Sequence, residues 1–307
     1  MFLVTGGAGF IGSHTVALLL EEGHRVRVID DLSSGHLQNL DGFDVEFIKG
    51  SVSDPRAVAE AMNGCSNVIH LAANPSVPGS CEDPVAYDTT NVHGTVVVFE
   101  AARREGVAQV AYASSSAVYG SSEEIPKRET MRVAAESPYA AAKAADELYA
   151  QSYSRTLGLP CVGLRYFNVF GPRQDPNGPY AAVIPKFVER ALKGQPLLVF
   201  GDGDQGRDFV HVSDVARANV RAATCACTGG KVYNIGAGSM TTVNQLVRYV
   251  QSTVAEVPVE FRAERAGDVR FSVADISEAG ADLDWTPQAD FDAGMAETID
   301  WYRRALS

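Results

Sequence analysis

Tyr139 and Lys143 are the residues in this chain whose types and spacing best suit acid–base chemistry. Ser137 and Pro138 are typical of the first positions of a helix, and the alanine-rich segment that follows favours its continuation. Residues four apart share one helical face, so the Lys143 ammonium would lie near the Tyr139 phenol. A free phenol ionises only near pH ~10, but a nearby ammonium favours the phenolate, which could remove a proton from a substrate hydroxyl. The same spacing also occurs in ordinary surface helices, so its meaning depends on the surrounding elements.

A glycine-rich turn near the N-terminus predicts a dinucleotide-binding site. It follows a short apolar strand, Phe2–Thr5, and precedes a helical pattern that runs to about Glu22. The spacing of Gly6, Gly9 and Gly12 differs slightly from G-x-G-x-x-G, yet it allows the same tight turn. Such a turn lets the backbone approach a pyrophosphate at the start of the helix. A glycine turn without a ligand is the alternative.

Two acidic residues follow the second predicted strand, Arg25–Ile29. Asp30 and Asp31 lie about 20 residues after the glycines, where a carboxylate suits the ribose hydroxyls of NAD. A carboxylate at this place would repel the 2′-phosphate of NADP. The sequence therefore favours NAD, with a loop-capping role for these acids as the alternative.

Predicted strands and helices alternate through the first half of the chain. This alternation indicates an α/β fold with a doubly wound parallel sheet. After residue 165 the pattern loosens into a smaller, interleaved lobe that would close over the cofactor. We expect residues 1–165 to bind NAD and residues 166–307 to bind mainly substrate, with some segments returning to the first domain. Further strands are expected at 45–49, 68–71, 109–113, 161–165 and 197–200, and further helices at 55–62, 91–105, 138–157, 184–193, 212–224 and 242–253.

The composition of the 307 residues narrows the function further. The net charge of −12 argues against nucleic acid and acidic membranes as partners. The chain has no apolar run long enough for a membrane span, and it enters a strand at once, which leaves no room for a signal peptide. Five scattered cysteines are typical of reduced cytoplasmic thiols, and the six histidines form no cluster that would predict a metal site.

Together with the run Ser114–Ser116 and the segment Val118-Tyr119-Gly120, these motifs resemble the extended short-chain dehydrogenase/reductases, and most of all the UDP-hexose 4-epimerases. The resemblance covers essentially the whole chain and implies a Rossmann domain. It also implies that Ser115, Tyr139 and Lys143 are catalytic. Related 4,6-dehydratases carry Asp-Glu, and decarboxylases a Glu, where this chain has Ser116 and Ala117. This chain therefore lacks the acid–base groups that a 4,6-dehydratase or a decarboxylase would need.

The resemblance also implies which residues contact the cofactor. Ser51 and Val52 follow Gly50 at the adenine site, where the family usually has Asp after Gly. The full set is Gly6, Gly9, Phe10, Ile11, Gly12, Asp30, Asp31, Leu32, Ser33, Ser34, Gly35, Ser51, Val52, Leu71, Ala72, Ala73, Asn91, Tyr139, Lys143, Tyr166 and Phe167.

The resemblance implies the substrate contacts in the same way. Arg207 and Arg265 match two arginines that hold the diphosphate, and guanidinium forks suit phosphate oxygens. Asp268 would bond the uridine ribose. The implied substrate set is Ser76, Ser115, Ser116, Tyr139, Asn168, Ala182, Val183, Val199, Phe200, Arg207, Arg265, Asp268 and Ser272.

Ser272 bears on which sugar is accepted. It occupies the position at which glucose- and galactose-restricted relatives carry a tyrosine, so a small side chain would leave room for a 2-acetamido group. We expect NAD-dependent inversion at C4 of UDP-GlcNAc/UDP-GalNAc, and also of UDP-Glc/UDP-Gal, by a homodimer paired through helices 91–105 and 138–157. A UDP-glucuronic acid 4-epimerase is an alternative that Asn168 disfavours, and a non-catalytic NAD-binding regulator is a weaker one.

Overall fold

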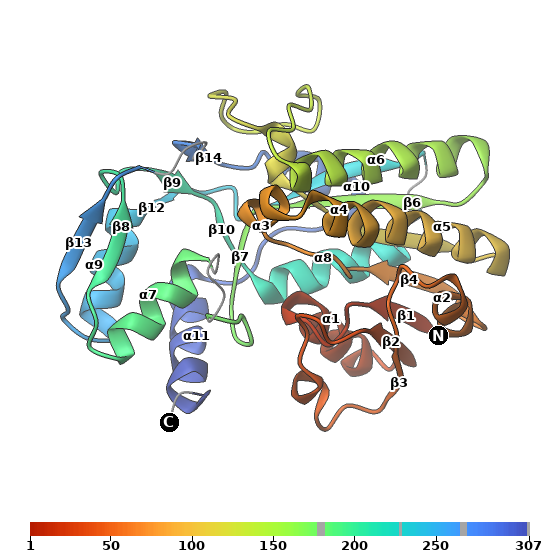
Figure 1. Cartoon of the computed structure of the whole chain (residues 1–307), viewed down its shortest axis with the longest axis horizontal. Coiled ribbons are helices and arrows are strands. Elements are labelled where there is room, and N and C mark those ends of the chain that lie inside the picture. Colours follow the sequence, from red (N-terminus) through yellow and green to blue (C-terminus); the bar gives the residue numbers. More distant parts are fainter. Residues whose placement is uncertain (177–181, 227–228, 265–268, 306–307) are drawn as a thin grey trace.

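The computed structural model of the chain describes residues 1–176, 182–226, 229–264 and 269–305. Its central element is a seven-stranded parallel sheet in the order β11-β6-β5-β4-β1-β2-β3 (Figure 1). This arrangement confirms the predicted doubly wound α/β fold. The strands are β1 Phe2–Thr5, β2 Val26–Asp30, β3 Val45–Lys49, β4 Asn67–His70, β5 Gln109–Ser115, β6 Cys161–Tyr166 and β11 Lys231–Ile235.

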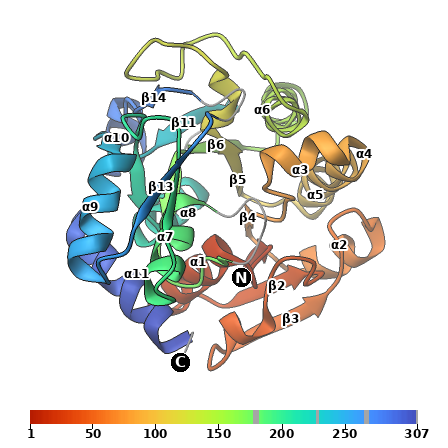
Figure 2. The same cartoon turned by 60° about the vertical axis from the view of Figure 1, so that its left-hand side comes forward.

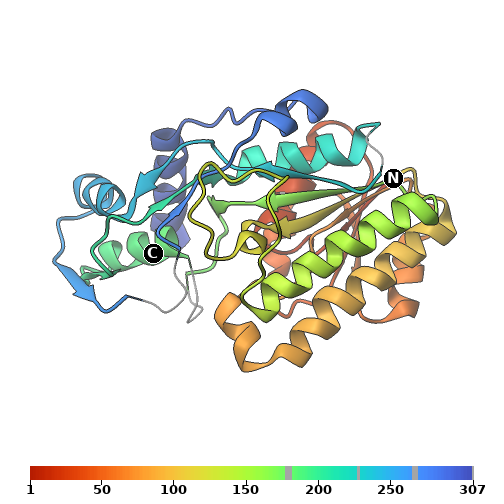
Figure 3. The ribbon, with the colours of Figure 1, turned by 90° about the horizontal axis from the view of Figure 1, so that it is seen from above.

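Helices cover both faces of this sheet. Successive strand residues point to opposite faces, so Val4 packs with α1 and α8, whereas Leu3 packs with α2, α5 and α6. Figure 3 shows α5 and α6 side by side across one face of the sheet, with α8 on the other. Within the residues described, none of the helices has both the length and the hydrophobicity that a membrane crossing requires. The helices are α1 Phe10–Glu21, α2 Pro55–Met62, α5 Gly94–Glu105, α6 Pro138–Thr156 and α8 Val212–Thr224.

Local sequence signals account for where several helices begin and end. The side chain of Asp54 accepts a hydrogen bond from Arg56 N at the start of α2, and Ser137 accepts one from Ala140 N at the start of α6. A proline occupies the first turn in both cases, where its missing N–H costs nothing. Helix α5 ends at Gly106, whose φ of 75° lies in the left-handed region that glycine tolerates.

Several elements differ from the sequence expectation. The helix expected at 91–105 begins as a separate π-helical turn, η2 Asp88–His93, and α5 starts only at Gly94. In this turn the Asn91 side chain exchanges two hydrogen bonds with the backbone of Asn74, at 2.8 and 3.1 Å. Strand β11 was not expected, yet it pairs with β6 at the end of the main sheet. Helix α8, expected in the smaller lobe, packs against α1 and the sheet.

The smaller lobe has a hydrophobic core of its own, seen beside the sheet in Figures 1 and 2. Its helices lie on the inner side of the parallel pair β8–β13, whose strand β13 is mostly exposed. The lobe also holds two short sheets, β7–β10 and β12–β9–β14. The elements are β7 Asn168–Phe170, α7 Val183–Leu192, β8 Leu197–Phe200, β9 Gly206–Arg207, β10 Phe209–His211, β12 Thr241–Thr242, α9 Val243–Thr253, β13 Val259–Arg262, β14 Phe271–Ser272 and α11 Phe291–Ala305. Short helices complete the chain: η1 Leu37–Leu40, α3 Val77–Glu82, α4 Pro84–Tyr87, η3 Ser116–Tyr119 and α10 Ser277–Leu283.

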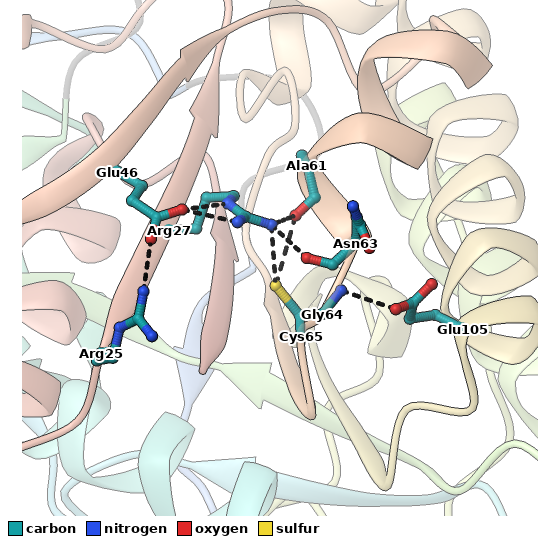
Figure 4. Close-up of polar contacts among 8 residues, drawn as sticks. All are labelled: Arg25, Arg27, Glu46, Ala61, Asn63, Gly64, Cys65 and Glu105. Atoms are coloured by element: carbon teal, nitrogen blue, oxygen red, sulfur yellow. Dashed lines mark hydrogen bonds and ion pairs between the residues drawn. The ribbon is translucent and has the colours of Figure 1, made fainter.

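One arginine joins the free edge of the main sheet to the neighbouring helix. Arg27 on β2 donates two hydrogen bonds to Glu46 on β3, at 2.9 and 2.7 Å (Figure 4). Its other terminal nitrogen donates to the carbonyl oxygens of Ala61 and Asn63, at 2.9 and 2.6 Å. Since the last carbonyls of a helix lack partners inside it, Arg27 satisfies the C-terminal end of α2 while it pairs the two edge strands.

Candidate active site

A crevice opens where the carboxyl ends of β1, β2, β4 and β5 meet, the usual ligand position in open α/β sheets. Its walls combine the glycine turn, both strand-end acids, and the tyrosine and lysine of α6. The lining residues are Gly6, Gly9, Phe10, Ile11, Gly12, Ile29, Asp30, Asp31, Ser33, Ser34, Gly35, Gly50, Val52, Leu71, Ala72, Ala73, Asn74, Pro75, Thr90, Ala113, Ser114, Tyr139, Lys143 and Tyr166.

Close backbone approach explains two of the glycines in the turn. Gly6 has φ of 69°, and a Cβ there would lie 2.7 Å from Ala72 N. A Cβ on Gly12 would lie 2.1 Å from the carbonyl oxygen of Gly6. Helix α1 begins directly after this turn with no side-chain cap and no acidic residue in its first turn, as far as the described residues show. Its first N–H groups therefore point into the crevice without competition from a carboxylate.

Asp30 is held at the crevice wall by two backbone amides. Its Oδ2 accepts a hydrogen bond from Ala8 N at 3.0 Å, and its Oδ1 accepts one from Leu32 N at 2.8 Å. Burial raises the pKa of Asp30, and these amide donors oppose that shift. Asp31 is exposed and accepts a hydrogen bond from Ser33 N at 2.9 Å. Each carboxylate retains acceptor positions for a ligand hydroxyl.

Tyr139 and Lys143 both line the crevice from the first turns of α6, as their spacing predicts. A second contact fixes the start of this helix, because the backbone N–H of Tyr139 donates to Ser80 Oγ on α3 at 3.0 Å. The Ser80 hydroxyl in turn donates to Val77 O at 2.6 Å. The Lys143 ammonium donates to Asp146 Oδ2 at 3.2 Å, and both side chains are almost completely buried.

The serine run ends β5 beside this helix. Ser114 lines the crevice, and its hydroxyl donates to Glu147 Oε1 at 2.6 Å. Ser115 is the last residue of the strand, and its Oγ accepts a hydrogen bond from Ala117 N at 3.1 Å. Ser116 begins the short helix η3. Ser114 is the one of the three that lines the crevice in the described structure, and its hydroxyl is committed to the buried acid; Ser115 and Ser116 are not among the lining residues, so the catalytic role of Ser115 stays a prediction.

A buried histidine lies beneath the crevice. His70 Nδ1 is 2.7 Å from Thr5 Oγ1, and its Nε2 is 3.0 Å from Thr95 Oγ1. Burial, together with the Lys143 ammonium, lowers the pKa of His70 to about 3. The ring is therefore neutral at pH 7. Because Thr5 Oγ1 also accepts from the amides that follow β4, this chain of bonds supports the crevice floor.

Four residues expected at the cofactor do not line the crevice. Leu32 contributes its backbone N–H to Asp30, and Ser51 Oγ accepts a hydrogen bond from Ser53 N. Asn91 is fully buried and clamps the backbone of Asn74, a lining residue. Phe167 packs in a small core with Val118, Tyr119 and Ala274.

On the substrate side, strand pairing places Ser272 of β14 beside Arg207 of β9. The Arg207 guanidinium donates to the carbonyl oxygens of Gly206 and Arg270, at 3.0 and 3.2 Å. The side-chain amide of Asn168 donates to Asp208 O at 3.3 Å. Arg265 and Asp268 lie outside the described residues.

The other expected substrate residues occupy element ends. Ser76 caps the start of α3, where its Oγ accepts from Gly79 N at 3.0 Å. Ala182 and Val183 form the start of α7. Val199 is fully buried in the core of the smaller lobe, so its side chain is not available to a ligand, whereas Phe200 ends β8 partly exposed.

Comparison with known proteins agrees with this geometry. Residues 2–236 match the model of the NAD dependent epimerase/dehydratase family. The chain belongs to this family. It is 42% identical to UDP-glucose 4-epimerase of Mycolicibacterium smegmatis over 98% of both chains. Two solved structures are similar: UDP-N-acetylglucosamine 4-epimerase from Methanobrevibacter ruminantium M1 in complex with UDP-N-acetylmuramic acid (TM-score 0.95, 39% identity, 99% of this chain and 98% of that one), and UDP-glucose 4-epimerase of Thermotoga maritima with UDP-glucose (TM-score 0.94, 39% identity, 100% and 99%).

The crevice of this epimerase/dehydratase fits NAD, the family's cofactor. The turn at Gly6 and Gly12 excludes any Cβ, so backbone amides can reach a pyrophosphate at the start of α1. Asp30 and Asp31 offer acceptors to ribose hydroxyls and would repel a 2′-phosphate. Tyr139 and Lys143 line the same crevice.

Sequence reasoning missed seven lining residues of this epimerase/dehydratase. Most directly neighbour residues that were expected, so the strand ends themselves were the available signal. Asn74, Pro75 and Thr90 also neighbour expected residues, but they lie beyond the strand ends, and the fold of the segment after β4 brings them to the crevice. The seven are Ile29, Gly50, Asn74, Pro75, Thr90, Ala113 and Ser114.

Proposed function

We propose that this enzyme inverts the configuration at C4 of a UDP-sugar through a 4-keto intermediate, with UDP-GlcNAc/UDP-GalNAc favoured and UDP-Glc/UDP-Gal also accepted. The observation that carries the proposal is the position of Tyr139 and Lys143 on the wall of the crevice that begins at the glycine turn. A base and a dinucleotide site thus share one cavity, and the named relatives with the same fold are 4-epimerases.

Three side chains would handle the proton of the reacting hydroxyl. Tyr139, as phenolate, takes the proton from the 4-hydroxyl and returns it after the sugar has turned. Lys143 favours the phenolate by its charge. Ser115 donates a hydrogen bond to O4. NAD⁺, when bound, supplies the chemistry of accepting the C4 hydride and giving it back.

Inversion requires that the sugar turn while the rest of the substrate stays in place. Arg207, together with Arg265, would hold the diphosphate through charge-assisted hydrogen bonds. Binding free energy is then concentrated on the UDP group, so the hexose can present either face to the cofactor.

The preference for N-acetyl sugars depends on Ser272. This small side chain pairs in register with Arg207, so it would lie next to the diphosphate end of the sugar. A serine there leaves space that a larger ring would fill, and an acetamido group could occupy it.

Proton NMR of the purified protein tests the proposal directly. Separate samples with UDP-GlcNAc, UDP-Glc and UDP-GlcA should show new anomeric signals of the C4 epimer without added NAD⁺, fastest with UDP-GlcNAc. Conversion of UDP-GlcA alone would replace the proposal with a uronic-acid epimerase, and conversion of none would reject it. Tyr139→Phe should lose at least about a hundredfold in kcat, the usual contribution of a general base; full activity in that variant would refute the role of Tyr139.

We also propose that the protein is a homodimer paired through α5 and α6. Two neighbouring apolar side chains on α6, Leu148 and Tyr149, are 67% and 42% exposed, and a contact between two copies of this helix would cover them. Sedimentation equilibrium should give twice the chain mass of 32.7 kDa, and Leu148→Glu should reduce it toward the single-chain value.

A further inference from the structure

A buried carboxylate lies directly beneath the lysine of the crevice. Asp146 follows Lys143 by three residues on α6, and its Oδ2 accepts a hydrogen bond from the ammonium at 3.2 Å. The two side chains are 4% and 1% exposed, so water does not screen the pair. The mechanism proposed above assigns Lys143 a role and leaves Asp146 without one.

The next residue, Glu147, is also a buried acid, but it is committed elsewhere. Arg165 on β6 donates two hydrogen bonds to it, at 2.8 and 2.7 Å, and Ser114 donates a third at 2.6 Å. Glu147 therefore does not compete for the Lys143 ammonium. The two adjacent acids therefore pair with different cations: Glu147 with Arg165, and Asp146 with Lys143.

Lys143 is the main group that holds Asp146 in place. Among the described residues, its Oδ1 has no hydrogen-bond partner. The Thr95 hydroxyl makes a smaller contribution that also lowers the pKa of Asp146, although its proton is donated to Asn91 O and His70 bonds Thr95 rather than the acid. Burial raises the pKa of Asp146 to about 6, and the Lys143 ammonium opposes that shift. At neutral pH the lysine is thus the group that keeps the carboxylate charged.

The other groups around this pair keep one charge state near neutral pH. His70 is neutral for the reason given above, and burial raises the pKa values of Tyr112 and Tyr166, which keeps both phenols protonated. The charges of Glu147 and Arg165 balance each other. The titratable groups whose charges act on the pair are His70 on β4, Tyr112 on β5 and Glu147 on α6. Tyr139 and Tyr166 line the same crevice as Lys143, and Arg165 pairs with Glu147.

We propose that Asp146 is a positioning residue for Lys143. Its carboxylate accepts a hydrogen bond from one of the three ammonium N–H groups and partly offsets the ammonium charge. In this way Asp146 influences the pH above which Tyr139 acts as a base. A carboxylate this close to the ammonium weakens the field that favours the phenolate. The remaining two N–H groups of Lys143 stay available to the crevice. This inference deepens the proposed function and rests on it for the catalytic part of its test.

Asp146→Asn is the decisive variant, because it removes the charge and keeps an oxygen acceptor for Lys143. The acid limb of the kcat–pH profile should move to lower pH, because the ammonium charge that favours the phenolate is no longer partly offset. The ultraviolet absorbance of tyrosinate, taken as each protein minus its Tyr139→Phe counterpart, should titrate at correspondingly lower pH. This second measurement needs no turnover, so an inactive protein would reject the proposed function without deciding the role of Asp146.

Asp300→Asn is a matched control. Asp300 pairs with Arg303 at the same three-residue spacing on α11, at 3.1 Å, but both side chains are exposed. This substitution should leave the acid limb and the tyrosinate titration unchanged. Asp146→Glu, which restores the charge, should return both toward the wild-type pH. An unmoved titration in folded Asp146→Asn, or a shift to higher pH, would overturn the proposal.

A stability measurement covers the case in which Asp146→Asn does not fold. In a Lys143→Met protein the carboxylate of Asp146 is buried without its cation, so adding Asp146→Asn should raise the melting temperature at pH 8. Equal melting temperatures for the single and double variants would show that the two side chains are not coupled, and would likewise overturn the proposal.

Discussion

Two clusters of charged side chains in this protein use the same arginine–glutamate chemistry in opposite surroundings. At the edge of the sheet, Arg25 and Arg27 meet Glu46, whose side chain is 46% exposed (Figure 4). Under the crevice, Arg165 meets Glu147, and each side chain is 4% exposed. The hydrogen bonds have nearly the same lengths in both clusters. Exposure is what separates them.

The difference shows where this fold depends on charge. A carboxylate at the edge can be hydrated if its partner is lost, and salt screens the pair. A buried carboxylate that loses its cation cannot be hydrated in this way, so the loss destabilises the fold strongly. The fold should therefore tolerate the loss of a charge in the edge cluster. The buried cluster, in contrast, holds β5, β6 and α6 together, and these elements carry Ser115, Tyr139 and Lys143.

The largest effect should come from Arg165→Met. This change leaves Glu147 buried and unpaired, and we expect a loss of about 3–5 kcal/mol in the free energy of unfolding, measured by urea denaturation. Arg27→Met in the edge cluster is the matched comparison, and it should lose clearly less. An equal loss in the two variants would remove the distinction between the clusters.

Acidification should give the next largest effect, because it charges a buried group. Burial, with Lys143, lowers the pKa of His70 to about 3, against about 6.5 in an unfolded chain. Between these values the unfolded state binds the proton, so His70 stabilises the fold above pH 6.5 and its contribution falls as the pH falls toward 3. We expect about 2 kcal/mol to be lost from this residue between pH 7 and pH 5.

Substitution can separate His70 from the other groups that titrate in this range. His70→Gln should flatten the pH dependence of stability without abolishing it, because His14 is also buried, with burial lowering its pKa to about 4. His24→Gln, at a 38% exposed side chain, should leave the dependence as it is. If the stability of His70→Gln depended on pH as steeply as that of the wild type, the role assigned to His70 would be wrong.

The smallest effect should follow Glu46→Gln. Two arginines hold the pKa of Glu46 below its usual value, so the pair is real, but the carboxylate is open to solvent. The variant should be only slightly less stable than the wild type at low salt, and the difference should vanish in high salt. A loss comparable to that of Arg165→Met would mean that the edge cluster is also shielded from water.

Local sequence patterns correctly predicted the helix and strands that border the crevice. Ser137 and Pro138 start α6 where their capping chemistry requires, and this places Tyr139 and Lys143 on one wall. The glycine turn and Asp30 lie where the first two strands end. These predictions succeeded because each depends on residues within a few positions of one another, whose geometry the backbone itself dictates.

Contacts between distant segments were not predictable in this way. Ser80 holds the Tyr139 amide across 59 residues, and β11 joins the sheet beside β6. Asp146, on an alanine-rich helix, has the sequence surroundings of an exposed acid. It is buried because α6 lies against the sheet and α5.

The sequence by itself determined the α/β class, the glycine turn, and the tyrosine–lysine spacing, since capping, propensity and helical periodicity act over short distances. Only the tertiary structure decided which charges are buried and which cation each acid meets, because burial depends on elements that come together from separate parts of the chain. The same carboxylate chemistry is consequently tolerant of change at Glu46 and sensitive to it at Glu147.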